Sequence, residues 1–191
     1  MKFITFFLLI VAGVASADNT LTVDQVGSNN TFTIDQTGNG HSASITAGKV
    51  SDVDYTTFAI TQQGTGAKTA TIEVKSGSNN SIAVYQDGAG NHTASIQSFV
   101  GSGNNISLTQ TGAGRHEFNI VNNPGTTNSG NTVTATQTGG SGSDKWFNVW
   151  FSGATGATVN VLQDNPTAAD QASMNVQCLS GTCGTYGYIK H

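Results

Sequence analysis

The stretch Asn19–Gln36, NTLTVDQVGSNNTFTIDQ, decides the fold of this chain. It contains two short runs in which apolar and polar residues alternate, one around Leu21 and Val23 and one around Phe32 and Ile34. Alternation with a period of two is typical of a β-strand that buries one face. The polar residues between the runs include Gly and Asn, which tolerate the positive φ of tight turns. The stretch therefore predicts two short strands joined by a turn.

The arrangement Gln-x-Gly closes the first run and then recurs along the chain. The pairs are Gln25/Gly27, Gln36/Gly38, Gln62/Gly64, Gln86/Gly88, Gln110/Gly112 and Gln137/Gly139, and Gln163 follows with Asn165 in the glycine position. Successive glutamines are 11, 26, 24, 24, 27 and 26 residues apart. Self-similarity at such a period is the signature of a solenoid or another repeat array.

Each period holds two alternating runs, which we interpret as two strands. The runs that end at a repeat glutamine have apolar pairs such as Phe58/Ile60, Ile82/Val84 and Ile106/Leu108, and the runs after the turn have pairs such as Ala70/Ile72 and Phe118/Ile120. Helical spacing is absent after residue 17. The sequence therefore predicts an all-β protein with two strands per repeat.

Stacked parallel strands, about 4.8 Å apart, place equivalent glutamines in register. Buried amides can then hydrogen-bond from rung to rung, which satisfies polar groups that would otherwise destabilise the core. We predict a parallel β-solenoid with two strands per rung and six to seven rungs over residues 18–177. The candidate ladder residues are Gln25, Gln36, Gln62, Gln86, Gln110, Gln137, Gln163, Asn19, Asn30, Asn80, Asn91, Asn104 and Asn131, with turn glycines Gly27, Gly38, Gly64, Gly88, Gly112 and Gly139.

Composition narrows the classes of function. Only 9% of the 191 residues are charged and the net charge is −4, so the chain lacks the high charge of disordered segments and the basic surface that nucleic acid requires. Met1–Ala17 has Lys2, an apolar run and a small-residue end, which predicts a secretory signal peptide cleaved before Asp18. No later run approaches the roughly 20 apolar residues of a membrane span.

The final segment, residues 178–191, is expected to be a tail or cap. Its cysteines, Cys178 and Cys183, would form a disulfide in an oxidising compartment and close a small loop. Trp146 and Trp150 share one face of the run KWFNVWF and are a candidate surface contact, either for a sugar or surface or for lateral packing. His92 and His116 would be neighbours in stacked rungs, and a metal or pH role competes with an incidental one.

Other motifs are weaker. Gly139–Asp144 matches the start of a calcium β-roll repeat only once, and the Thr-x-Thr pairs of ice-binding solenoids do not recur in every rung. We find no Ser/His/Asp or Cys/His set for catalysis, and a two-strand solenoid has no cavity for a small-molecule substrate. We expect no cofactor, no metal and no enzymatic activity.

The repeat resembles that of the curlin family, S-x5-Q-x-G-x2-N-x-A-x3-Q. The segment Asn19-x5-Gln25-x-Gly27-x2-Asn30-x-Phe32-x3-Gln36 fits every spacing, and Asn80-x5-Gln86-x-Gly88-x2-Asn91-x-Thr93-x3-Gln97 fits again. The first half recurs at Asn104 and at Asn131. The repeats here are longer than is usual in the family, so the resemblance is to a divergent member.

This resemblance implies a secreted subunit of an extracellular functional amyloid. Such subunits pass an outer-membrane secretion channel and polymerise on a nucleator subunit into fibres used in adhesion and biofilm matrix. The implied partner is therefore the chain itself, with no nucleic acid and no membrane span. A monomeric secreted β-solenoid adhesin or fibre module that binds glycans or surfaces is the alternative, and a polysaccharide-active enzyme on a β-helix is more distant.

Overall fold

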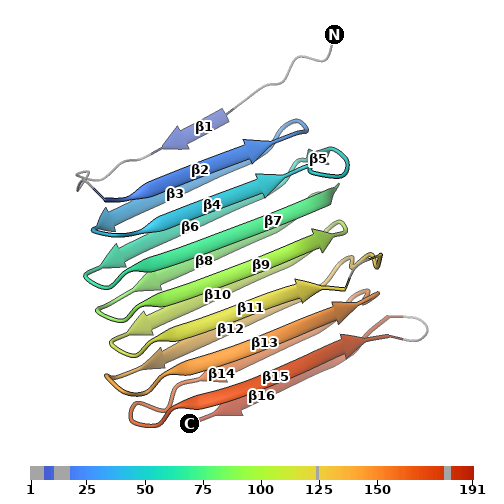
Figure 1. Cartoon of the computed structure of the whole chain (residues 1–191). Coiled ribbons are helices and arrows are strands. Elements are labelled where there is room, and N and C mark those ends of the chain that lie inside the picture. Colours follow the sequence, from blue (N-terminus) through green and yellow to red (C-terminus); the bar gives the residue numbers. More distant parts are fainter. Residues whose placement is uncertain (1–6, 11–17, 124, 179–181) are drawn as a thin grey trace.

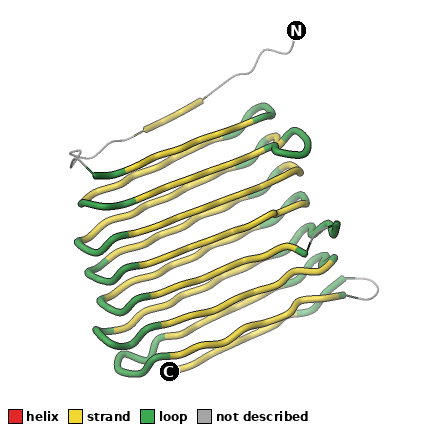
Figure 2. Tube along the Cα trace, viewed as in Figure 1, coloured by secondary structure: helices red, strands yellow, loops and turns green. Residues whose placement is uncertain are grey.

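The structure is a computed structural model that describes residues 7–10, 18–123, 125–178 and 182–191. Within these residues it contains sixteen strands and no helix, which confirms the all-β prediction (Figure 2). The strands are β1 (Phe7–Ile10), β2 (Thr20–Gln25), β3 (Thr31–Gly38), β4 (Ser42–Ala47), β5 (Val53–Asp54), β6 (Thr57–Gly64), β7 (Lys68–Ser78), β8 (Ser81–Asp87), β9 (His92–Val100), β10 (Asn105–Gly112), β11 (His116–Asn122), β12 (Thr132–Gly139), β13 (Lys145–Ser152), β14 (Thr158–Gln163), β15 (Asp170–Gln177) and β16 (Thr185–Lys190).

The strands form two parallel sheets that lie face to face (Figure 1). Sheet A has the order β1-β3-β6-β8-β10-β12-β14-β16, and sheet B has the order β15-β13-β11-β9-β7-β4-β2. The chain alternates between the sheets, so one strand from each makes a rung. The pairs β2–β3, β4–β6, β7–β8, β9–β10, β11–β12, β13–β14 and β15–β16 give about seven turns, as predicted.

The register brings equivalent residues of successive repeats together. In sheet A, Gln86 pairs with Gln110 and Gln110 with Gln137, while in sheet B Ile72 pairs with Ile96. A slip by one residue would turn the apolar and amide side chains outward together, which fixes this register.

The core is a thin layer between the two sheets. Inward-facing residues of both sheets are almost fully buried, whereas their outward-facing neighbours are mostly Ser, Thr and Asn. Identical aromatic residues stack from rung to rung, with ring centroids 5.0 Å apart for Phe32 and Phe58 and 5.7 Å apart for Phe118 and Phe147. Burial of these columns is the main favourable term of the fold.

Two corners connect the sheets. The Q-x-G corner carries the Gln-x-Gly turns and leads from a sheet A strand to the next sheet B strand, and the Asn corner leads back to sheet A. The long connections from Ala47 and from Asn122 both lie at the Asn corner, on the right in Figure 1. The first of them contains β5, which pairs with the end of β7.

Strands at both ends of the chain add to sheet A. The final strand β16 pairs with β14 along Thr158–Gln163, so residues 185–190 continue the solenoid rather than form a separate tail. Most of the expected leader lies outside the described residues, but β1 pairs with β3 in sheet A. None of the described residues belongs to a helix long and apolar enough to cross a membrane.

Candidate functional site

A ladder of six glutamines runs through the Q-x-G end of sheet A. It consists of Gln36, Gln62, Gln86, Gln110, Gln137 and Gln163. Each of the first five donates a hydrogen from Nε2 to Oε1 of the next, at 2.7–2.9 Å. Each Nε2 of the six also donates to a backbone carbonyl oxygen on the sheet B side, at 2.9–3.3 Å. The ladder therefore joins rung to rung and sheet to sheet.

Gln25 does not belong to this ladder, contrary to our expectation. It lies at the end of β2 in sheet B, pairs in register with Ala47, and donates from Nε2 to the carbonyl oxygen of Gly27 at 2.8 Å. The spacing of 11 residues from Gln25 to Gln36 is the distance across one rung, whereas the other spacings are full repeats. The similar local sequence hides the fact that the first Gln-x-Gly lies in the opposite sheet.

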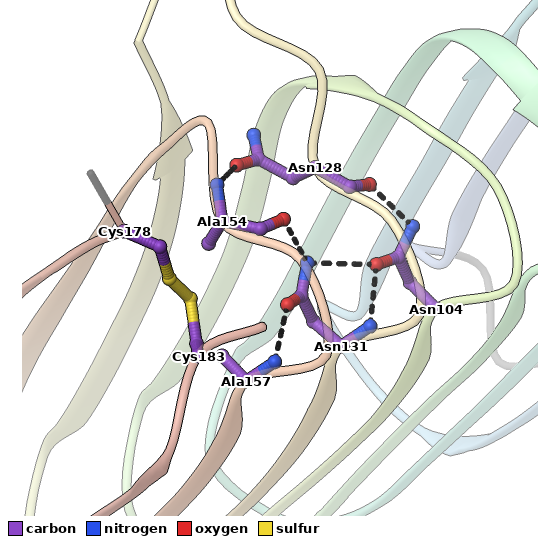
Figure 3. Close-up of a disulfide and its surroundings, with 7 residues drawn as sticks. All are labelled: Asn104, Asn128, Asn131, Ala154, Ala157, Cys178 and Cys183. Carbon is purple, nitrogen blue, oxygen red and sulfur yellow. Dashed lines mark hydrogen bonds between the residues drawn. A yellow bond between two sulfur atoms is a disulfide. The ribbon is translucent and has the colours of Figure 1, made fainter. Parts of the chain in front are cut away.

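A second ladder runs through the Asn corner. It contains Asn30, Asn80, Asn104 and Asn131, all of them buried. Each Oδ1 accepts the backbone N–H of the equivalent residue in the next rung, at 2.8–3.0 Å for the bonds to Thr56, Asn104, Asn131 and Ala157. Each Nδ2 donates to a carbonyl oxygen of the following loop, at 2.6–3.0 Å. Figure 3 shows its last steps around Asn104 and Asn131.

Three further asparagines form hydrogen bonds at the two corners. Asn128, which the sequence did not single out, accepts the backbone N–H of Ala154 at 2.7 Å through Oδ1 (Figure 3). Asn19 and Asn91 lie at the Q-x-G corner instead of the Asn ladder. Asn19 accepts from His41 N at 2.9 Å, and Asn91 accepts from Ala67 N at 3.0 Å. Our single set of ladder asparagines is therefore two sets at opposite corners.

The turn glycines form a column that allows the rungs to approach closely. Gly38, Gly64, Gly88 and Gly112 have φ between 96° and 121°, a region that side chains with a Cβ rarely adopt. A Cβ at each of these glycines would meet the backbone of the equivalent glycine in the next rung. The column ends at Gly139. Gly27 also has positive φ, but it lies at the Asn corner against Val53.

Trp146 and Trp150 lie on the outer face of sheet B and are half-buried, whereas Phe147, Val149 and Phe151 point into the core. The indole Nε1 of Trp146 donates to Glu117 Oε1 at 3.1 Å. An open pocket of about 460 Å³ lies beside it, lined by Arg115, Glu117, Asp144, Lys145, Trp146, Ala169 and Gln171. Trp150 is not among the lining residues.

Cys178 and Cys183 form a disulfide beside the last asparagines of the corner (Figure 3). It connects β15 to β16, and both cysteines are half-buried against the core. The loop that it closes is short, so the cross-link constrains little of the unfolded chain.

We expect a Cys178→Ser, Cys183→Ser variant to lose about 2 kcal/mol of stability or less, because a loop of this length contributes little entropy. Hydrogen exchange should quicken in β15 and β16 and stay unchanged in the inner strands β8 and β10, which serve as the internal control. Equal loss of protection in the inner strands would contradict a local role for the disulfide.

The apolar residues of the two terminal rungs differ from those of the inner rungs. Inner ones are almost completely buried, but Leu21 and Val23 at the start, and Ala172, Met174, Tyr186 and Tyr188 at the end, are only half-buried. These residues continue the same columns as the core. The core therefore extends to the end faces of the solenoid.

Comparison with known protein families identifies the repeat. Residues 17–46 and 77–112 match the family model of the curlin associated repeat. The chain carries curlin repeats. The two matches confirm the resemblance to the curlin family, whose members are structural rather than enzymatic. No curated protein and no solved structure matched this curlin-repeat protein.

The sequence predicted His92 and His116 as neighbours in stacked rungs, and the register confirms this. It did not reveal that both belong to a longer buried column at the start of the sheet B strands. His41, Lys68, His92, His116 and Lys145 occupy it in successive rungs. A signal was present, because a histidine or lysine stands directly before the second alternating run in HSASI, KTATI, HTASI, HEFNI and KWFNV.

Proposed function

We propose that this curlin-repeat protein is the structural subunit of an extracellular curli-like amyloid fibre, in which copies stack end to end by parallel strand addition. The observation that carries the proposal is the half-buried apolar core at both end faces. A solenoid that remains monomeric needs polar caps over such faces, and open edge strands template further strands. Family resemblance supplies the wider roles: adhesion, biofilm matrix, a secretion channel and a nucleator subunit.

The two end faces complement each other if the register of the rungs continues into the next copy. Met174 would then lie against Val23 of that copy, and Tyr186 against Phe32, where aromatic stacking already joins Phe32 to Phe58. Val23, Met174 and Tyr186 are half-buried in the single chain, so these contacts would bury more of their apolar surface. At about 25 cal/mol per Å² of apolar area, such burial favours association.

The direction of the glutamine ladder also fits this arrangement. Every amide donates toward the C-terminal end, so Gln36 Oε1 is an acceptor at the N-terminal end of the ladder. At the other end Lys190 pairs in register with Gln163 and takes the ladder position. An ammonium group only donates hydrogen bonds. Lys190 of one copy would therefore meet a free acceptor on the next.

The N-terminal edge of sheet A is occupied by β1. Leu8 pairs with Phe32 and Ile10 with Ile34, in the parallel register that a preceding rung would have. We expect β1 to leave with the signal peptide. Its removal would expose the edge of β3 for strand addition by another copy.

We expect the chain that begins at Asp18 to polymerise after dilution from denaturant, and Val23→Lys to slow this by about tenfold or more, because the junction would bury an unpaired charge. Thioflavin-type fluorescence and electron microscopy provide the measurement. Thr22→Lys is the matched control, since Thr22 is exposed on the outer face of the same strand and should polymerise like the parent.

Two results would count against this proposal. If the parent chain stays a soluble monomer for days, the proposal of self-assembly is wrong. The monomeric adhesin or fibre module then becomes the better interpretation. If the parent polymerises and Val23→Lys does so at the same rate, the end-face junction is wrong.

A further inference from the structure

A column of ionisable side chains is buried along the Q-x-G corner. His41, Lys68, His92, His116 and Lys145 occupy equivalent positions in five successive rungs and are at most 1% exposed. Asn19 precedes the column in the first rung and Asp170 follows it in the last. The rings of His92 and His116 are stacked, with centroids 4.8 Å apart and planes within 5°.

The three histidines have the same hydrogen bonds, which fix the neutral ring. Nε2 lies 3.2 Å from Thr37 O in His41, 2.8 Å from Asp87 O in His92 and 3.0 Å from Thr111 O in His116. A carbonyl oxygen only accepts, so Nε2 carries the hydrogen. Each Nδ1 is buried without a hydrogen-bond partner among the described residues. A proton added at Nδ1 of His41 or His92 would therefore be a buried charged donor with no acceptor, which is strongly unfavourable. At His116 the backbone of Arg115 favours the proton, but burial has the larger effect on the pKa.

The lysines in the column are held by backbone carbonyls. Lys68 Nζ donates to Gly66, Gly88 and Gly90 at 2.8–2.9 Å, and Lys145 Nζ donates to Asn165 at 2.8 Å and to Ala168. Lys68 lies between His41 and His92, and Lys145 follows His116. Protonated histidines would thus have cationic neighbours at the spacing of one rung.

The acidic groups near the column are Asp87, Asp144, Asp164 and Asp170. Asp87 favours a proton on His92, Asp144 favours one on His116, and Asp164 and Asp170 act on Lys145. Asp170 is already bonded to Tyr188 and Gln163. Burial outweighs these attractions: it lowers the pKa of His41 and of His116, and it lowers the pKa of His92 from 6.5 to about 4.

The lowered pKa values of the histidines determine how the stability of the fold changes with pH. A histidine whose pKa is lower in the folded chain takes up its proton more readily in the unfolded chain. The fold is therefore unaffected above the unfolded pKa of about 6.5 and loses stability as the pH falls toward about 4.

We propose that this column makes the solenoid acid-labile, because protons taken up by His41, His92 and His116 disrupt the Q-x-G corner and unfold its rungs. This acid lability is a property of each folded chain, whether or not copies polymerise. Neutral conditions permit folding, and mild acid reverses it.

The unfolding equilibrium constant should rise by about 100-fold or more between about pH 7 and pH 4, since a histidine with the shift of His92 contributes that much alone. Denaturant unfolding of dilute, freshly refolded chain measures it. His92→Asn should reduce the pH dependence by a comparable factor. Asparagine fits this position, because Asn19 occupies it in the first rung and bonds Gly38 O at 2.9 Å.

His191→Asn is the matched control, since His191 is exposed and pairs only with Asp164 among the described residues. It should leave most of the pH dependence in place. Equal pH dependence in the parent and in His92→Asn would overturn the proposal. If His92→Asn fails to fold, nuclear magnetic resonance of the parent decides: the ring of His92 should stay neutral from about pH 7 to pH 5. Titration of the buried rings near their usual pKa with the fold intact would also overturn it.

Discussion

Gly88→Ala is expected to destabilise the chain by at least about 4 kcal/mol, a large fraction of the stability of a typical domain. Gly88 has a φ of 101°, so an alanine there is strained even in open space. Space is also missing, because the new Cβ would meet the carbonyl oxygen of Gly112 and lie 2.8 Å from its backbone nitrogen. The neighbour is backbone of the next rung, which cannot turn away as a side chain could.

Gly187→Ala is the control for this variant. Gly187 lies in β16, its φ is outside the left-handed region, and a Cβ would have no heavy atom within 4 Å. Its stability should change by about 0.5 kcal/mol or less. Denaturant unfolding followed by circular dichroism measures both variants. If Gly88→Ala were as stable as Gly187→Ala, the close approach of successive turns would be wrong.

Gln110→Leu is expected to cost about 3–6 kcal/mol, although leucine has a similar size and greater hydrophobicity. The replacement removes three hydrogen bonds of a side chain that is only 1% exposed: one from Gln86, one to Gln137 and one to the carbonyl oxygen of Thr93. The loss of each bond leaves a buried partner group without that hydrogen bond, which lowers the stability by about 1–3 kcal/mol.

The same replacement at Gln97 is the matched control, because Gln97 is exposed on the outer face of β9 and bonds Ser95 Oγ. Its free energy of unfolding should change by about 0.5 kcal/mol or less. Hydrogen exchange adds a second measurement, since Gln110→Leu should expose the amides of β8 and β12 on either side. A neutral Gln110→Leu would show that apolar burial, rather than the ladder, holds the rungs together.

The fold could be predicted from the sequence because period-two alternation and the Gln-x-Gly repeat describe the same rungs. Alternation determines which face is buried, and recurrence of Gln62, Gln86 and Gln110 determines which strands stack. Phase was harder. Gln25 has the same local surroundings as the other repeat glutamines, and only the pairing of whole strands reveals that it lies in sheet B. For the same reason, the sequence did not show that Asn19 and Asn91 lie outside the Asn ladder.

Apart from the pairing of His92 with His116, the buried column could not be predicted, and the physical reason is different. The turns of the Q-x-G corner differ in length, so His41 and Lys68 do not lie at constant distances from their preceding glutamines. Lysine is also rarely fully buried. Two of the three carbonyl oxygens that bind Lys68 come from the turn of the following rung, and no local pattern indicates such a contact.

The neighbour-only pairing of the rungs has a consequence for the length of the molecule. Every rung rests on the one before and the one after, so the end faces are independent of how many rungs lie between them. The segment from Ser81 to Asn104 is one full repeat, because Asn105 pairs in register with Ser81. Duplication or loss of such a segment would change the height by one strand spacing, about 4.8 Å, and preserve both faces. Height is therefore a quantity that evolution can adjust in discrete steps while the joining chemistry stays fixed.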